Sequence, residues 1–345
     1  MYLMSAIDRL AVLNKLSKTT SGAIFAAIST LLFLTSQYLP VFGAFAVFFC
    51  PLPLILMHVR FRDLKYTSLV VLVSSTLVGI FSGPISALCF LMGVGLLGVS
   101  LGVTIAARKS AMFSIITSGI VLLVSTLALT LMASSMMDAD VSMKKQFALM
   151  AESLKKARDE NMETLKKSGA TQEQIKQIDD LYTQTIETMK GMHIYAPLML
   201  FCGALISAFF NYKASCLILK RLKYQSEELP GFETWRISWT IIWLFIAGLL
   251  FVNAFDEKVS LTQRYLVIAG KNINAAFMAA FIINGLAIVH YYFKFYKVNV
   301  TLRIFLYMII FMNPVFHSLV LMTGIMDPWL DIRKFENNDQ ITKEV

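Results

Sequence analysis

Residues 84–107 read PISALCFLMGVGLLGVSLGVTIAA and contain no charged side chain. A helix needs about 20 mostly apolar residues to cross the hydrocarbon core of a bilayer, so this stretch by itself predicts a membrane span. The whole chain of 345 residues is 57% hydrophobic and 15% charged, with a mean hydropathy of +0.66. Soluble domains are about half apolar and a quarter charged. A soluble enzyme, a disordered protein and a disulfide-stapled secreted domain are therefore excluded.

Eight further stretches are long and apolar enough to be membrane spans. Together with the first, they are residues 20–38, 41–58, 64–81, 84–107, 111–135, 194–219, 237–254, 273–292 and 302–323. The second and third are short, and Pro51 and Pro53 interrupt the second. The sequence predicts an all-α fold, a polytopic transmembrane helical bundle of about nine spans.

The chain divides at the ends of these stretches. Residues 1–19 place apolar side chains at helical spacing opposite charged ones, which is typical of an amphipathic helix on a membrane surface. Residues 20–135 and 194–325 hold the membrane helices, and residues 326–345 form a polar tail. No cleavable signal peptide precedes the first span.

Residues 136–193 form the largest polar segment and carry two amphipathic helical stripes. Gly169 between the stripes suits a helix C-terminus, and Thr171 with Gln174 fits a capping box. The segment predicts an antiparallel helical hairpin that continues the fifth and sixth membrane helices on the extracytoplasmic side.

The net charge of +9 indicates an orientation rather than a nucleic-acid partner. One set of connections, which includes residues 60–65, 108–109 and 220–236, carries sixteen basic and five acidic side chains. Short cytoplasmic loops carry an excess of Lys and Arg. The chain is therefore expected in a bacterial cytoplasmic membrane with its N-terminus inside, and nine spans place the tail from Asp327 outside.

Chemistry-bearing residues are scarce in the predicted spans, which contain no Asp or Glu. Proton-coupled carriers usually need an intramembrane carboxylate, so this absence argues against a proton antiporter. No catalytic pattern, nucleotide-binding Gly-rich loop or metal-ligand spacing is recognisable, and the four cysteines lie unpaired in apolar stretches. The sequence predicts neither an enzyme nor a cofactor.

The remaining polar side chains within the spans are candidate ligand-binding residues. They are Asn284, Asn313, His317, Asn211 and Lys213. Asn313 and His317 are four residues apart and would share one helix face. These groups either line a binding cavity, with Lys213 as an anion anchor, or bond neighbouring helices while Lys213 extends to the cytoplasmic surface.

Small residues on the first predicted span form a candidate docking face for another helix or subunit. They are Gly22, Ala23, Ala26 and Ala27. The fourth span carries a similar run of glycines, for which close helix packing is the simpler interpretation and a ligand between helices the alternative.

Two non-helical segments carry distinctive motifs. Residues 229–235 read LPGFETW, and residues 324–333 read GIMDPWLDIR. Both resemble hallmarks of the YybS-like family of bacterial membrane proteins, which has no established function. The matching positions are Leu229, Pro230, Phe232, Trp235, Gly324, Asp327, Trp329, Asp331 and Arg333.

The N-terminal third is similar to the substrate-binding subunits of energy-coupling-factor transporters, on the small-residue first helix, the Leu39-Pro40 and Pro51–Leu54 segments and the Gly-rich fourth helix. This resemblance implies that the first helix docks a coupling subunit and that a small ligand binds near the outer face. The leading hypothesis is non-enzymatic capture or transport of a small solute in the lipid bilayer. The alternative is a structural scaffold that uses the hairpin to bind partner proteins.

Overall fold

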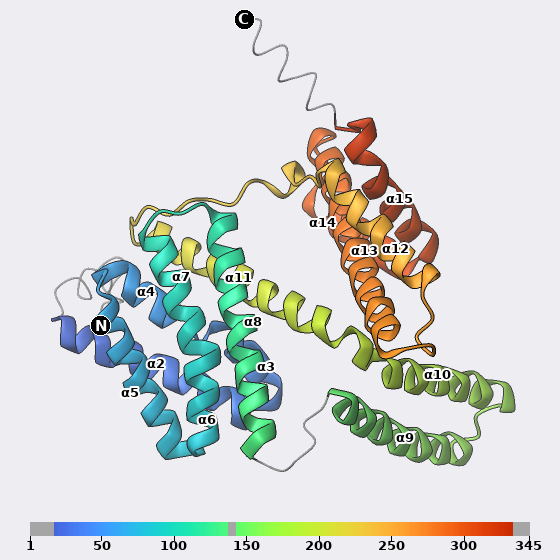
Figure 1. Cartoon of the computed structure of the whole chain (residues 1–345), viewed down its shortest axis with the longest axis horizontal. Coiled ribbons are helices and arrows are strands. Elements are labelled where there is room, and N and C mark those ends of the chain that lie inside the picture. Colours follow the sequence, from blue (N-terminus) through green and yellow to red (C-terminus); the bar gives the residue numbers. More distant parts are fainter. Residues whose placement is uncertain (1–16, 137–142, 334–345) are drawn as a thin grey trace, which may run out of the picture. The chain divides into compact units, whose positions relative to one another are not determined.

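The computed structural model describes residues 17–136 and 143–333, and Figure 1 shows that its regular elements over these ranges are helices. The predicted amphipathic helix at residues 1–19 lies outside the described residues except for its last three positions. The chain forms two compact units. Unit 1 comprises Met1–Lys190 and Met199–Leu229, and unit 2 comprises Gly191–Leu198 and Pro230–Val345. Residues 199–229 therefore group with the helices that precede the hairpin.

Unit 1 is built from apolar helices joined by short turns. Their bounds are α2 Lys18–Tyr38, α3 Pro40–Phe49, α4 Leu52–Phe61, α5 Leu64–Ser82, α6 Pro84–Cys89, α7 Leu96–Ala106, α8 Ala111–Met136 and α11 Ala196–Arg221. Between α6 and α7 the helix widens into a π-helical segment, η1, at Phe90–Gly95. The predicted span at 41–58 is divided into α3 and α4, with the break at Cys50 and Pro51.

Local capping explains where several of these helices begin. The Ser17 side chain accepts a hydrogen bond from the Thr20 amide at the start of α2, and Asp63 accepts one from the Tyr66 amide at the start of α5. Both side chains satisfy amides that the first helical turn leaves without partners. Lys18 then pairs with Asp63 at 2.5 Å, which joins the two helix starts.

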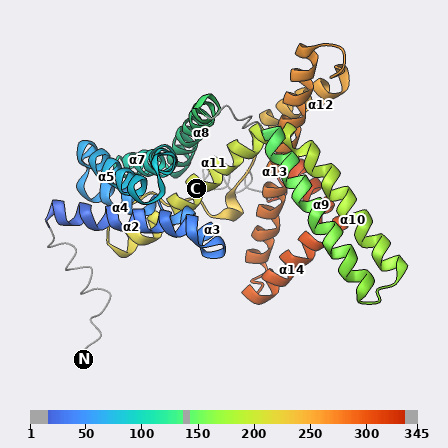
Figure 2. The same cartoon turned by 90° about the horizontal axis from the view of Figure 1, so that it is seen from below.

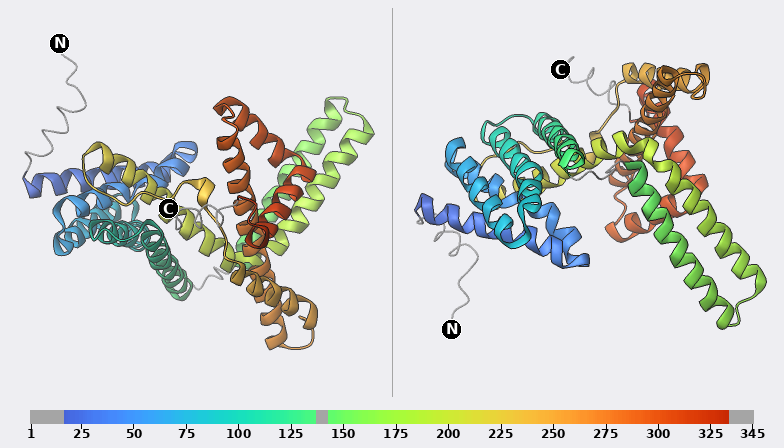
Figure 3. Two further views of the ribbon diagram at one scale, coloured as in Figure 1. Left: turned by 90° about the horizontal axis from the view of Figure 1, so that it is seen from above. Right: turned by 60° about the horizontal axis from the view of Figure 1, so that its bottom comes forward.

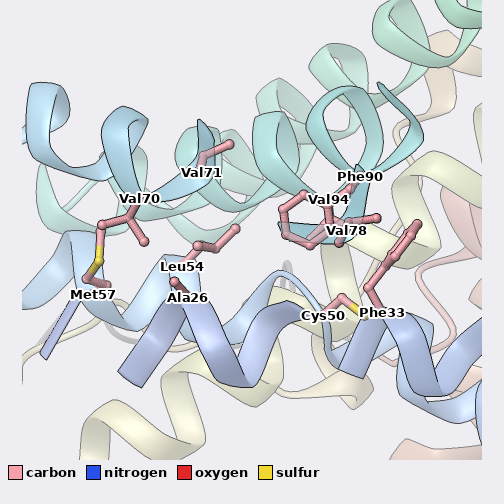
Figure 4. Close-up of a cluster of buried hydrophobic side chains, with 10 residues drawn as sticks. All are labelled: Ala26, Phe33, Cys50, Leu54, Met57, Val70, Val71, Val78, Phe90 and Val94. Carbon is pink, nitrogen blue, oxygen red and sulfur yellow. The ribbon is translucent and has the colours of Figure 1, made fainter. Parts of the chain in front are cut away.

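The core of unit 1 lies where α2, α4, α5 and η1 meet (Figure 4). Phe33 of α2 lies edge-to-face against Phe90 of η1, with ring centroids 5.3 Å apart. A second cluster joins α4, α7, α8 and α11 around Leu101 and Tyr212. These contacts fix the helices that surround the cavity described below.

The polar segment forms the predicted helical hairpin. Helix α9 covers Met143–Lys167 and α10 covers Gln172–Gly191, and Figures 1 and 2 show them antiparallel. The capping box is present, because the Thr171 amide donates to Gln174 Oε1 and the Gln174 amide donates to Thr171 Oγ1. Gly169 adopts the left-handed backbone conformation, with φ of 77°.

Unit 2 is organised around one long helix, α13, which covers Leu261–Phe295. Its other elements are η2 Met192–Tyr195, η3 Phe232–Thr234, η4 Trp239–Ile241, α12 Ile242–Ala254, α14 Val300–Met312 and α15 Pro314–Leu330. Helices α12 and α15 both pack on α13. Helix α15 approaches α13 closely because a Cβ atom on Gly324 would overlap the Phe281 carbonyl oxygen, and one on Gly285 would overlap that of Val320.

The ninth predicted span, 302–323, is not a single helix. Helix α14 ends at Met312, Pro314 begins α15, and the two helix axes differ by 98°; Figure 3 shows the bend. The Asn313 side chain caps α15 by accepting from the Val315 amide at 2.9 Å. The break follows from Pro314, which lacks the amide hydrogen that a continuous helix needs.

The bent pair begins and ends at the same end of unit 2. Helix α14 starts at Val300, directly after α13 ends, and beyond α15 the Ile332 carbonyl accepts a hydrogen bond from Tyr292 near that same end of α13. Arg333 bonds the backbone of the loop that leads into α12. The predicted position of the tail on the side opposite this loop is therefore wrong for residues 326–333, and residues 334–345 lie outside the described residues.

Six helices among the described residues are long and apolar enough to cross a membrane, or seven if α14 and α15 count as one span. The segments Phe45–Phe61 and Trp239–Ala254 are apolar but shorter. The chain is therefore a multi-pass, all-helical membrane protein that associates with a lipid bilayer.

Candidate ligand-binding site

A cavity of about 270 Å³ lies inside unit 1, among helices that are far apart in the sequence. Its walls come from α2, α3, α6, η1, α7, α8 and α11, and it borders the core drawn in Figure 4, with which it shares Phe33 and Val94. The lining residues are Phe33, Val47, Phe48, Pro51, Cys89, Gly93, Val94, Leu97, Leu122, Ser207 and Asn211. None of these carries a charge.

Asn211 is the most polar side chain in the lining. Its side chain is buried, with 1% of its surface exposed, and its Nδ2 donates to the Ser207 carbonyl one turn earlier in α11 at 2.9 Å. Its Oδ1 has no hydrogen-bond partner among the described residues. The Ser207 carbonyl can only accept, so the amide cannot be reversed, and the open position is an acceptor. A buried acceptor without a partner is costly, and such groups call for an explanation.

The π-helical segment forms one wall of the cavity. π-Helical turns occur mostly as single insertions in α-helices and are frequent at functional sites. Gly93 lies within this turn, and a Cβ atom built on it would meet nothing within 4 Å. The glycine therefore leaves space in the cavity wall that a larger side chain would fill.

A second polar feature is a buried charged cluster in unit 2. Arg333 is 1% exposed, and its Nη2 lies 2.7 Å from Oδ2 of the fully buried Asp327. The same nitrogen donates to Asn284 Oδ1 at 3.3 Å. Arg333 Nη1 donates to the carbonyls of Glu233 and Trp235 at 2.8 and 2.7 Å. The guanidinium thus joins α13, α15 and the loop before α12.

Neighbouring groups extend this cluster towards the surface. Arg236 lies 3.3 Å from Asp331 and 3.9 Å from Asp327. Lys294, at the end of α13, bonds Glu233 and holds the pKa of that carboxyl below its usual value. Asp331 adopts a left-handed backbone conformation, with φ of 40°, and ends α15 so that Arg333 turns back towards the helices.

The structure does not gather the predicted residues Asn284, Asn313 and His317 into one site. Asn284 is buried in the cluster, where its Nδ2 donates to the Gly324 carbonyl at 2.9 Å. Asn313 is exposed and caps α15, and His317 is half-buried one turn further along. Ligand binding by these three residues stays a prediction.

Lys213 and Asn211 lie near each other on α11 but serve different places. Lys213 is exposed and lines a surface pocket of about 210 Å³ together with Lys220 and Glu228, which form a 2.6 Å ion pair. Asn211 lines the buried cavity.

The predicted docking face on α2 divides into two. Gly22 and Ala26 are buried, and Gly22 lies beneath the Tyr66 hydroxyl of α5, so these two residues serve packing within unit 1. Ala23 and Ala27 are exposed.

The two distinctive motifs meet in three dimensions. The segment 230–236 supplies backbone carbonyls and Arg236 to the buried cluster, and the segment 324–333 supplies Gly324, Asp327 and Arg333. Phe232 packs on Trp235 and on His290 of α13. Leu229 is the last residue of unit 1, while Trp329 is exposed.

Sequence reasoning missed Asp327 as a carboxylate of a membrane helix. The last span was expected to end before it, but α15 continues to Leu330 and buries Asp327 completely. The detectable signal was Arg333, a basic residue six positions further on that could accompany a buried acid. No group of three or more potential metal ligands occurs in residues 17–136 and 143–333.

Comparison with known proteins identifies a family. No curated protein and no solved structure shows significant similarity to the chain. A family model described as "Predicted membrane protein (DUF2232)" matches residues 27–328, which include both the cavity and the buried cluster. Because this match extends over most of the sequence, the chain belongs to the DUF2232 family of predicted membrane proteins.

Proposed function

We propose that this protein is a non-enzymatic membrane subunit that binds a small solute for transport, with energy supplied by other subunits. The observation that carries the proposal is the Asn211 acceptor, buried and without a described partner in an otherwise apolar cavity. Ligand sites are typically apolar cavities with a few placed polar groups, which fits this arrangement. The resemblance to substrate-binding subunits of energy-coupling-factor transporters gives the proposal its form.

In this proposal the protein lies in a bacterial cytoplasmic membrane with its N-terminus and the basic 220–236 loop inside. The Lys and Arg bias of the short connections supports that orientation. The α9–α10 hairpin then projects on the extracytoplasmic side. Ala23 and Ala27, exposed on α2, offer a small-residue face to a coupling subunit.

The test is recovery of a bound molecule from the purified protein. Gly93→Leu fills the open space in the cavity wall, and the matched control Gly203→Leu makes the same change at an exposed site on α11 where a Cβ also meets nothing. Native mass spectrometry of the protein in mild detergent is expected to show a small molecule bound to the wild type and the control, and absent from Gly93→Leu. Wild-type occupancy in Gly93→Leu would overturn the proposed site.

The alternative function is a membrane scaffold that binds partner proteins through the hairpin. The observation that favours it is exposed apolar surface on a polar segment, at Leu149 and Met150 of α9 and Leu181 of α10. Exposed apolar patches outside the membrane often mark protein contacts. Reproducible recovery of partner proteins, with no small molecule bound to the wild type, would favour the scaffold and exclude solute capture.

A further inference from the structure

The chemistry of the unit 1 cavity narrows the class of its ligand. We infer that the cavity takes an uncharged, compact, mostly apolar molecule about the size of two fused rings, which donates one N–H or O–H hydrogen bond to Asn211 Oδ1. This inference rests on the proposed function and specifies its ligand.

The absence of charged side chains from the lining excludes an ionic ligand. The lining residues include two aromatic rings, Phe33 and Phe48, and no Asp, Glu, Lys, Arg or His. Moving an ionised group from water into such surroundings without a counter-charge costs far more than apolar contacts return. The ligand must therefore enter in its neutral form.

The volume sets the size. A cavity of about 150 Å³ lined by apolar side chains accommodates benzene. The cavity in unit 1 has a volume of about 270 Å³, a little less than twice that. A fused bicyclic ring system fills this volume, whereas a single ring leaves empty space, with the loss of packing that a void brings.

The hydrogen bond sets the direction of recognition. Because Asn211 Nδ2 is used by the Ser207 carbonyl, the amide offers only its oxygen to the cavity. A ligand with a donor satisfies that oxygen, and a ligand with only acceptors leaves it buried without a partner. A lipid acyl chain, the other apolar molecule available in a membrane, has no donor and would leave Asn211 unsatisfied.

The probes are indole, 1-methylindole and indole-3-acetate, which share the fused ring system. Indole has a donor, 1-methylindole lacks it, and indole-3-acetate adds a negative charge. We expect purified wild-type protein in detergent to bind indole about three- to tenfold more tightly than 1-methylindole, which corresponds to one net hydrogen bond. Indole-3-acetate is expected to show no measurable binding in the same titration calorimetry.

Two variants separate the roles of the residues. In Asn211→Leu the preference for indole over 1-methylindole is expected to disappear while both still bind. In Gly93→Leu neither is expected to bind, and Gly203→Leu is expected to match the wild type. Thermal unfolding of each variant shows that it is folded, and Asn211→Gln, which keeps the amide, is expected to restore part of the preference.

The failures are distinguishable. Equal affinity of the wild type for indole and 1-methylindole, tight binding of indole-3-acetate, or no binding of any probe would overturn the ligand class. If Gly93→Leu nevertheless loses its co-purified molecule, the proposed function stands without this inference. If Gly93→Leu retains the molecule, both are overturned.

Discussion

Arg333 shows how a single side chain can hold unit 2 together. Its guanidinium bonds a carboxylate on α15, an amide on α13 and two backbone carbonyls of the loop before α12. Burying two charges costs several kcal/mol per ion in desolvation, so a pair of this kind is tolerated only when its geometry and hydrogen bonds are good. The cluster therefore depends on both partners being present.

Removal of one charge is expected to destabilise unit 2 strongly. Arg333→Met leaves Asp327 buried without its cation, which should lower the free energy of unfolding by about 3–5 kcal/mol. The double variant Arg333→Met with Asp327→Leu removes both charges and should recover most of that loss. The fluorescence of the four tryptophans, which all lie in unit 2, follows thermal unfolding of the purified protein.

Lys156→Met, at an exposed position of α9, serves as the control for this series and should change the stability by less than about 0.5 kcal/mol. An equal loss in the single and double Arg333 variants would show that the cluster stabilises unit 2 by packing and not by its ion pair.

At the scale of single residues, the sequence could indicate which side chains are unusual but not which partners they have. Asn284 was recognised as polar within a span, yet its partners Gly324, Asp327 and Arg333 lie 40 to 49 positions away. Asn211 was recognised in the same way, but its open acceptor depends on the Ser207 carbonyl and on walls from six other elements. Such pairings are set by tertiary packing, which local patterns do not encode.

Among the elements, the bend between α14 and α15 has the largest effect on topology. A straight span would carry the chain to the opposite membrane surface, whereas the pair begins beside the end of α13 and returns to it. Non-helical backbone at membrane depth is tolerated where protein surrounds it or where capping satisfies it, and Asn313 supplies such a cap. The pair therefore has the connectivity of a re-entrant helical hairpin.

This connectivity predicts that the C-terminal tail and the 220–236 loop lie on the same side of the membrane. Single cysteines introduced by Lys223→Cys and Asn338→Cys, in a chain whose four native cysteines are replaced, should react together with a membrane-impermeant thiol reagent. Both are expected to react in inside-out vesicles and neither in intact cells. Labelling of the two positions from opposite sides would rule out the re-entrant connection.

Sequence patterns predicted the elements better where local chemistry decides them. The hairpin of α9 and α10, its capping box at Thr171 and the turn at Gly169 were predicted, because each depends on residues a few positions apart. The π-helical turn at Phe90–Gly95 was not, because a run of apolar residues reads alike for either helix type. The break before Pro314 could have been read from the proline, but the hydropathy of the flanking residues favoured one continuous span.

For the whole molecule, the two units separate the cavity from the buried charged cluster. Each residue of the cavity lies in unit 1, and each residue of the cluster lies in unit 2. The lining of the cavity includes no residue of the hairpin between α8 and α11. Ligand binding and hairpin-mediated contacts are therefore separable by mutation.

Replacement of residues 143–190 by a flexible Gly-Ser linker is expected to leave the co-purified small molecule bound, because the cavity walls are unchanged. Any partner protein held by the hairpin should be lost in the same preparation. Native mass spectrometry of the small molecule and a comparison of co-purified proteins measure both. Loss of the small molecule from a variant that still unfolds at the wild-type temperature would show that the hairpin takes part in binding.

Helix α13 also has a bearing on bilayer thickness. The 22 residues between Lys271 and Lys294 carry no Asp, Glu, Lys or Arg and extend about 33 Å at 1.5 Å per residue, close to the roughly 30 Å of an average hydrocarbon core. Both lysines pair with acidic residues of adjoining loops, Glu257 and Glu233. The two ion pairs therefore mark where this helix meets the lipid headgroups. In a thinner or thicker membrane, hydrophobic mismatch would be felt first at these pairs, and through Glu233 at the loop that Arg333 holds.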